Sequence, residues 1–231
     1  MTLLLLSNST NYGGGYLDHA MPAIRELFAG VRSLVFVPFA LHDVDAYTAR
    51  VRARFAREGV EVQGVGLDAG PAAVEDAEAV FVGGGNTFRL LLRMQECDLL
   101  HELRERVLAG MPYLGASAGT NIAAPTIQTT NDMPIVEPLA FEALHLVHFQ
   151  INPHYVDADP ASIHMGETRE QRLLEYLEEN RYPVVGLREG GWLRVEGPRV
   201  RLEGAGARLF RRGRDPQDVE PPAELAPMLA G

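Results

Sequence analysis

The sequence of 231 residues contains no lysine, and all of its 21 basic residues are arginine. Because 31 acidic residues outnumber them, the formal net charge is -10 at pH 7. A molecule with this charge repels the phosphate backbone of nucleic acids. We therefore expect no nucleic-acid partner.

Cysteine is almost absent, since Cys97 is the only one. A single cysteine cannot form an intrachain disulfide, and no spacing of cysteine and histidine resembles a zinc site. The sequence also lacks an apolar run near the roughly 20 residues that cross a bilayer, and no basic segment precedes its first apolar run, as it would in a signal peptide. These absences predict a cytoplasmic protein with no metal and no membrane contact.

The composition that remains is that of a globular protein, with 46% hydrophobic and 23% charged residues. Short apolar runs alternate with segments of helical period, which is the pattern of strands joined by crossover helices. We therefore predict an α/β fold with a mostly parallel sheet flanked by helices. The predicted strands are residues 3–6, 34–39, 60–65, 79–82, 113–115 and 149–152.

The last part of the chain has a different pattern. Residues 184–210 alternate strand-like pieces with glycine-rich turns, which predicts an antiparallel meander on one edge of the sheet. From Gly213 onward the sequence is polar and rich in proline, so we expect a loosely held tail over residues 213–231. Residues 1–212 are then expected to form a single domain.

One candidate for chemistry is the stretch GASAG at residues 115–119, between a predicted strand and an apolar helix-like segment. Small residues on both sides of a serine are typical of a nucleophile elbow, where a sharp turn lifts the hydroxyl clear of the sheet. The same residues also fit a plain turn in which Ser117 caps a helix.

A second candidate is the loop GGGNTF at residues 83–88, which also follows a predicted strand. Glycines allow backbone N–H groups to approach a ligand closely. A phosphate-binding loop lacks support, because no lysine follows and the dinucleotide fingerprint is incomplete. If Ser117 is a nucleophile, an N–H group of this loop and that of Ala118 are expected to form an oxyanion hole. A plain tight turn is the other interpretation.

A third candidate joins two proline-containing loops, NDMP at residues 131–134 and NPHY at residues 152–155. Ser117, Asp132 and His154 follow the order serine, acid, histidine, although triads occur in several chain orders. A serine hydroxyl needs a base near pH 7, and a carboxylate fixes the tautomer of the imidazole. The sequence therefore predicts a catalytic triad of these three residues.

Taken together, these segments resemble the peptidase E family, from the first predicted strand to about Trp192. That family consists of cytoplasmic α-aspartyl dipeptidases, which are serine peptidases on a fold similar to class I glutamine amidotransferases. The matching segments are LLSNST at 5–10, GGGNTF at 83–88, GASAG at 115–119, TTNDMP at 129–134, INPH at 151–154 and GETREQR at 166–172.

The resemblance implies hydrolysis of dipeptides with an N-terminal aspartate, Asp-Xaa, without a metal or organic cofactor. It also implies either a homodimer or a monomer whose sheet edges are covered. Glu189 matches a family position as well and competes with Asp132 as the acid. The resemblance implies these roles: Ser117 as nucleophile, His154 as general base and acid, Asp132 or Glu189 as the orienting acid, and Gly85 and Ala118 as oxyanion N–H donors.

Arg169 is expected in the first turn of a helix that Thr168 caps, where the helix dipole disfavours a cation. Such a residue needs an anionic partner. Glu167 and Glu170 are the ordinary candidates, and the carboxylate of a substrate aspartate is the functional one, because a guanidinium holds a carboxylate with two hydrogen bonds. Asn86 is a weaker candidate for holding the substrate amine or peptide carbonyl.

Two other functions compete with this interpretation. A cyanophycinase-like serine hydrolase has a similar fold and elbow but acts on β-aspartyl-arginine polymers. An inactive module that binds an acidic metabolite through the same glycine-rich loops belongs to a different class and needs no activated hydroxyl.

Overall fold

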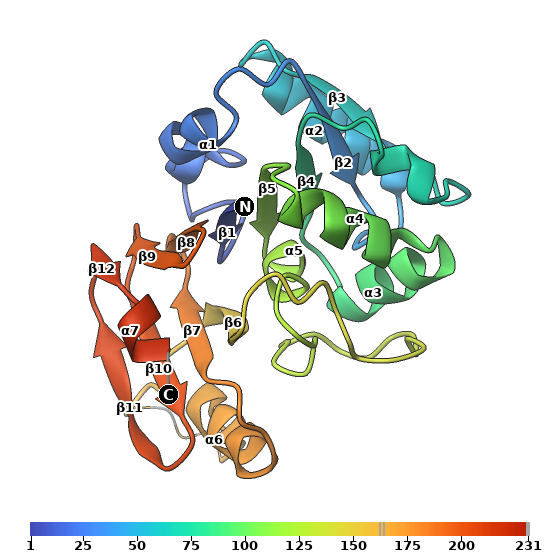
Figure 1. Ribbon diagram of the computed structural model, residues 1–231. Coiled ribbons are helices and arrows are strands. Elements are labelled where there is room, and N and C mark those ends of the chain that lie inside the picture. Colours follow the sequence, from blue (N-terminus) through green and yellow to red (C-terminus); the bar gives the residue numbers. More distant parts are fainter. Residues whose placement is uncertain (162, 164, 230–231) are drawn as a thin grey trace.

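The computed structural model describes residues 1–161, 163 and 165–229, and Figure 1 shows how they are arranged. Its centre is an eight-stranded sheet that contains a parallel set of strands. In spatial order this set is β3 (Glu61–Gly64), β2 (Ser33–Val37), β4 (Val80–Val82), β5 (Tyr113–Ala116) and β1 (Thr2–Leu6). The prediction of an α/β fold with a mostly parallel sheet is confirmed.

Helices cover both faces of this sheet, as the alternation of buried side chains along β1 shows. The even-numbered leucines of β1 belong to one hydrophobic cluster and the odd-numbered leucines to another. The first cluster includes α1 (Met21–Leu27) and α2 (Val44–Ala56), and the second includes α3 (Thr87–Glu96) and α4 (Leu99–Leu108). Strands buried on both faces read as continuous apolar runs, which is why the sequence predicts them well. Two short 3-10 helices, Asp18–Ala20 and Pro71–Val74, complete the connections.

Local capping explains where two helices begin. The side chain of Asp43 accepts a hydrogen bond from the N–H of Ala46 at the start of α2. Helix α6 (Arg169–Glu179) begins at the predicted cap, Thr168, which forms a capping box with Gln171. The capping box fixes the position of Arg169 in the first turn of α6.

The predicted antiparallel strands near the end of the chain are present, and they are divided between two sheets. Strand β8 (Trp192–Glu196) pairs antiparallel with β1 and continues the main sheet through β9 (Arg199–Glu203). A separate four-stranded sheet contains β6 (Gln150–Tyr155), β7 (Val184–Arg188) and β10 (Ala207–Arg211). The turn after β7 carries the chain from the second sheet into the first, so it lies between them (Figure 1).

The expectation of a loose tail is wrong for residues 213–229. Strand β11 (Arg214–Val219) is the edge of the second sheet, β12 (Ala223–Glu224) is the edge of the main sheet, and α7 (Ala226–Leu229) follows. A proline is tolerated on an edge strand, because one side of that strand makes no ladder hydrogen bonds. Leu225 is buried, so this segment packs against the rest of the protein although its composition is rich in proline. Ala230 and Gly231 lie outside the described residues.

No helix in the described part of the chain is both long enough and apolar enough to cross a membrane.

Candidate active site

Ser117 lies on a sharp turn between β5 and the short helix α5 (Ala118–Asn121). Its backbone has φ 52° and ψ -109°, a conformation that L-residues rarely adopt. Its N–H donates to the carbonyl of Leu6 over 3.0 Å, which ties the turn to the end of β1. This strand–turn–helix geometry is that of a nucleophile elbow rather than of a simple helix cap.

The small residues around Ser117 are required by close backbone contacts. A Cβ atom on Gly119 would overlap the carbonyl of Val82 in β4, and one on Gly115 would overlap the carbonyl of Gly119. The elbow therefore packs directly against the neighbouring strand, and larger side chains at these positions would push Ser117 out of place.

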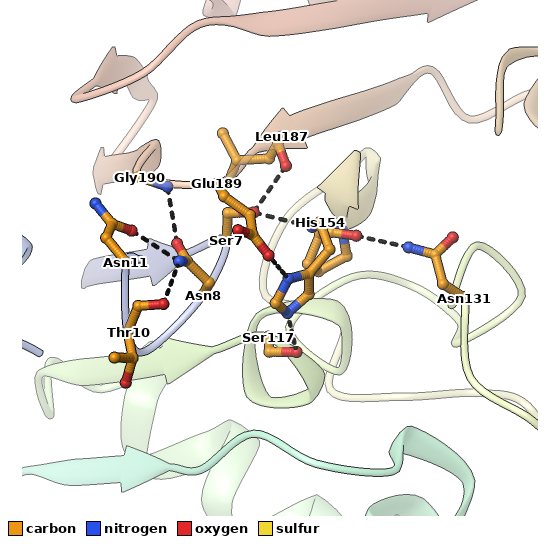
Figure 2. A network of polar contacts seen from close by, with 11 residues as sticks. Ser7, Asn8, Thr10, Asn11, Ser117, Asn131, His154, Leu187, Glu189 and Gly190 are labelled. Carbon is orange, nitrogen blue, oxygen red and sulfur yellow. Dashed lines mark hydrogen bonds and ion pairs between the residues drawn. The ribbon is translucent and has the colours of Figure 1, made fainter. Parts of the chain in front are cut away.

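His154 lies between Ser117 and Glu189, as Figure 2 shows. Its Nε2 atom is 2.9 Å from the Oγ of Ser117, and its Nδ1 atom is 2.6 Å from Oε1 of Glu189. With the proton on Nδ1, the ring donates to Glu189 and accepts from the Ser117 hydroxyl. This tautomer is the one in which an imidazole can take a proton from a serine.

The backbone at His154 is irregular. Its φ is 54°, and the register between β6 and β7 shifts between Pro153 and Tyr155. A bulge of this kind redirects a side chain. Here it directs the imidazole out of the ladder toward the elbow.

Asp132 does not contact His154, contrary to the predicted triad. Its Oδ2 atom accepts hydrogen bonds from the N–H of Thr87 at 2.7 Å, the hydroxyl of Thr87 at 2.6 Å and the hydroxyl of Thr130 at 3.2 Å. Chain order carries no information about distance, and these bonds hold the carboxylate at the N-terminus of α3. Of the two candidate acids, the structure places Glu189 against the imidazole.

Asp132 nevertheless lines the same small cavity as Ser117 and His154. Its second oxygen, Oδ1, accepts no hydrogen bond from any residue that the structure describes. One carboxylate oxygen beside the nucleophile is therefore available to a ligand.

The glycine-rich loop lies against the nucleophile. A Cβ atom on Gly84 would be 3.0 Å from the Cβ of Ser117, and the N–H of Gly84 donates to the hydroxyl of Tyr47 over 2.9 Å. Gly85 has φ +135°, which other residues rarely adopt. Within the described part of the chain, the N–H groups of Gly85 and Ala118 have no hydrogen-bond acceptor, so both are free to donate to an oxyanion.

Asn86 holds the loop together. Its Oδ1 accepts from the N–H of Arg89 at 3.0 Å and caps α3, while its Nδ2 donates to the carbonyl of Met133 at 2.8 Å. Both polar ends of the side chain are thus engaged within the protein, which differs from the expected substrate contact.

Arg169 makes no ion pair with any described residue, whereas its expected partners are engaged elsewhere. Glu167 lies 3.4 Å from Arg172, and Glu170 lies 2.8 Å from Arg208. Burial lowers the pKa of the Arg169 guanidinium, the charge of Arg172 lowers it further, and the nearby charge of Asp132 opposes the shift. A partly buried cation close to Asp132 is therefore available for an anionic ligand.

Several residues in the segments that the sequence singles out have roles in the site that were not predicted. The side chain of Asn152 donates to Asn131 at 2.7 Å, and Asn131 donates to the carbonyl of Pro153 at 2.7 Å, which fastens the Asp132 loop to β6. Ser7 and Asn8 lie beside the triad at the end of β1. In the sequence, Ser7 and Asn8 are a polar pair directly after a buried strand. Such a pair indicates a site, because ligand sites of parallel sheets lie at the carboxyl ends of the strands.

Among the residues that the structure describes, no group of three or more histidine, cysteine, aspartate or glutamate side chains could hold a metal ion.

Comparison with known proteins gives a consistent result. The sequence profile of peptidase family S51 matches residues 3–203. A protein named "Peptidase E" from Streptomyces coelicolor is 56% identical over 231 residues, which cover 99% of this chain and 95% of that protein. A protein named "Probable alpha-aspartyl dipeptidase" from Drosophila melanogaster is 48% identical, with 98% and 97% of the two chains covered.

A solved structure described as a peptidase from an acI-B1 actinobacterium has a similar fold, with a TM-score of 0.72 and 16% sequence identity. The match covers 96% of this chain and 95% of that chain.

Proposed function

The chain belongs to peptidase family S51, and we propose that it is a serine-type dipeptidase that hydrolyses dipeptides with an N-terminal aspartate, Asp-Xaa. The observation that carries this proposal is the contact of the Ser117 hydroxyl with His154 on a nucleophile elbow. The relatives named peptidase E and alpha-aspartyl dipeptidase support the same activity. The cyanophycinase-like hydrolase and the inactive binding module are not favoured.

The first half of the reaction forms an aspartyl-enzyme. As the Oγ of Ser117 attacks the peptide carbonyl, Nε2 of His154 takes the hydroxyl proton, and Glu189 stabilises the imidazolium that results. The N–H groups of Gly85 and Ala118 donate to the oxyanion of the tetrahedral intermediate. When the intermediate collapses, the peptide C–N bond breaks and Nε2 gives its proton to the departing amine.

The second half of the reaction releases aspartate. A water molecule takes the place of the departed amino acid, and Nε2 of His154 removes one of its protons as its oxygen attacks the ester. Collapse of the second intermediate breaks the bond to Oγ and returns the proton from His154 to Ser117. The enzyme then has its original protonation state.

Two charged side chains support recognition of the N-terminal aspartate: Asp132, which lines the same cavity as Ser117, and Arg169, which interacts with the charge of Asp132. Such a residue carries a side-chain carboxylate and an α-ammonium group, one of each sign. Arg169 has no ion-pair partner among the described residues, and Oδ1 of Asp132 accepts no hydrogen bond from them. We assign Arg169 to the substrate carboxylate and Asp132 to the α-ammonium, because charge-assisted hydrogen bonds are the strongest ones that such a site can offer.

A cytoplasmic location remains a prediction from the composition and the family resemblance, and a homodimer or a monomer with covered sheet edges remains a prediction from the resemblance. The free thiol of Cys97, which donates to the carbonyl of Leu67, is compatible with a reducing compartment.

A panel of dipeptides that vary only in the first residue tests the proposed function. Wild-type protein is expected to hydrolyse Asp-Leu and to reject Asn-Leu, Glu-Leu and β-Asp-Arg, while Ser117→Ala protein of unchanged fold hydrolyses none of them. Hydrolysis of β-Asp-Arg in preference to Asp-Leu would replace the proposal with the cyanophycinase-like one.

A further inference from the structure

The segment Leu6–Ser7–Asn8 at the end of β1 contacts the backbone at or beside each member of the proposed triad. The carbonyl of Leu6 accepts from the N–H of Ser117, and the hydroxyl of Ser7 accepts from the N–H of His154 over 2.9 Å. The Oδ1 of Asn8 accepts from the N–H of Gly190, next to Glu189, over 2.8 Å. Figure 2 shows Ser7 and Asn8 beside the imidazole and the turn that carries Glu189.

Ser7 has the most informative position of the three. Its side chain is fully buried, and its hydroxyl donates to the carbonyl of Leu187 in β7 over 2.7 Å while it accepts from His154 in β6. The N–H of Ser7 donates to the carbonyl of Gly191, on the far side of Glu189. One residue therefore connects the strand that carries the base with the turn that carries the acid.

This connection occurs where the β6–β7 ladder is interrupted. The register shifts between Pro153 and Tyr155, and His154 has φ 54°, a conformation that is unfavourable for a residue with a side chain. A buried N–H group needs an acceptor. The interrupted ladder offers none to the N–H of His154, and the Ser7 hydroxyl accepts its hydrogen bond instead. Without it, the N–H of His154 has no acceptor to hold the bulge.

We propose that Ser7 is a positioning residue for the reaction: its hydroxyl holds the bulge at His154 against β7, so that the imidazole reaches Ser117 and Glu189 at the same time. The proposal rests on the proposed function. Ser7 acts through His154 and touches no reacting atom. A displacement of about 1 Å in a catalytic group is enough to cost roughly 100-fold in rate.

The variant Ser7→Ala removes the hydroxyl with little change in volume. We expect kcat for Asp-Leu to fall roughly 10- to 100-fold while KM changes by less than about 3-fold, because the ground-state contacts of the substrate are elsewhere. The neighbouring Ser9→Ala variant is the matched control, since no described residue hydrogen-bonds to the Ser9 hydroxyl, and its kcat is expected to match the wild type. Ser7→Thr keeps a hydroxyl and is expected to restore most of the rate.

A double-mutant cycle separates positioning from a general structural effect. If Ser7 acts through the His154–Glu189 pair, Ser7→Ala costs much less in a Glu189→Gln background, because the imidazole is already poorly oriented there. Equal fold-losses in both backgrounds, or an unchanged kcat in Ser7→Ala, would overturn the proposal. Should Ser7→Ala fail to fold, Ser7→Cys replaces it in the same cycle.

The rate at which a fluorophosphonate modifies Ser117 gives a readout that needs no peptide substrate. Slower labelling of Ser7→Ala than of Ser9→Ala supports the positioning role even if Asp-Leu is not hydrolysed by the wild type, an outcome that would reject only the proposed substrate. Equal labelling rates would reject the positioning role itself.

Discussion

Oε1 of Glu189 lies 2.6 Å from Nδ1 of His154, although 35 residues separate them in the sequence. The acid follows β7 and the base belongs to β6, so the parallel pairing of these two strands brings them together. Their side chains are 57% and 41% exposed, so water competes with this hydrogen bond. We therefore expect the acid to contribute to the rate but less than a fully buried carboxylate does.

Replacement of Glu189 by glutamine removes the charge that stabilises the imidazolium and keeps the size of the side chain. We expect kcat for Asp-Leu to fall about 100-fold, less than for a buried triad acid. Steady-state kinetics measure the effect, with Glu137→Gln as a control for the loss of an exposed carboxylate. A wild-type kcat in Glu189→Gln would remove this residue from the mechanism.

Replacement of Asp132 by asparagine tests recognition of the α-ammonium group. Succinyl-leucine is Asp-Leu without its amino group, so it cannot use the proposed contact. We expect Asp132→Asn to lower kcat/KM for Asp-Leu roughly 10- to 100-fold, the effect of one charge-assisted hydrogen bond, and to leave succinyl-leucine nearly unchanged. An equal loss for both substrates would instead make Asp132 part of the chemistry or of the fold.

Replacement of Arg169 by glutamine removes the proposed partner of the substrate carboxylate. The discrimination between Asp-Leu and Asn-Leu is expected to fall by at least about 10-fold, because the preference depends on pairing a partly buried cation. Arg172→Gln, on the same helix, serves as the control, since Arg172 already lies near Glu167. Unchanged discrimination in Arg169→Gln would show that the carboxylate binds elsewhere.

His19 makes the stability of the fold depend on pH. Burial lowers its pKa, with the charge of Asp18 opposing, and neither ring nitrogen has a hydrogen-bond partner among the described residues. Between the ordinary histidine pKa of about 6.5 and the lowered pKa of the folded state, the unfolded chain therefore binds a proton that the folded chain does not, so the free energy of unfolding decreases as the pH falls through this range. Above this range the contribution is constant.

Urea unfolding at about pH 7.5 and about pH 5.5 measures this contribution. The loss of stability on acidification is expected to be smaller in His19→Phe, which keeps an aromatic ring beside Trp192, than in the wild type or in a His42→Asn control. If the free energy of unfolding of His19→Phe fell on acidification as much as that of the wild type, this pH dependence could not be assigned to His19.

The parallel core of the fold was predictable because β1, β2, β4 and β5 are buried on both faces and read as nearly uninterrupted apolar runs, whereas β3 is a partly exposed edge strand. The elbow at Ser117 was predictable for a related reason: close approach of backbones excludes all but small residues, which leaves a local pattern. The second sheet was not predictable, since β6 and β7 are short and buried along most of their length, and such strands have the same sequence pattern whichever sheet they join. The ordered end of the chain was missed because its buried apolar residues, Val219 and Leu225, are isolated in a polar, proline-rich stretch.

The candidate site was predictable only as a set of residue types. Which carboxylate meets the imidazole depends on the bulge at His154 and on the turn after β7, and neither has a local sequence signal. Asn86 likewise looked available to substrate, because the sequence does not show that Met133 and Arg89 occupy both ends of its amide. Long-range backbone contacts such as those of Ser7 become visible only in three dimensions.

Covalent modification of Ser117 tests the central claim most directly. Wild-type protein treated with a fluorophosphonate is expected to gain one adduct, located on Ser117 by peptide mass spectrometry, in step with the loss of Asp-Leu hydrolysis. Complete loss of hydrolysis with Ser117 unmodified, or full modification of Ser117 with hydrolysis intact, would contradict the account.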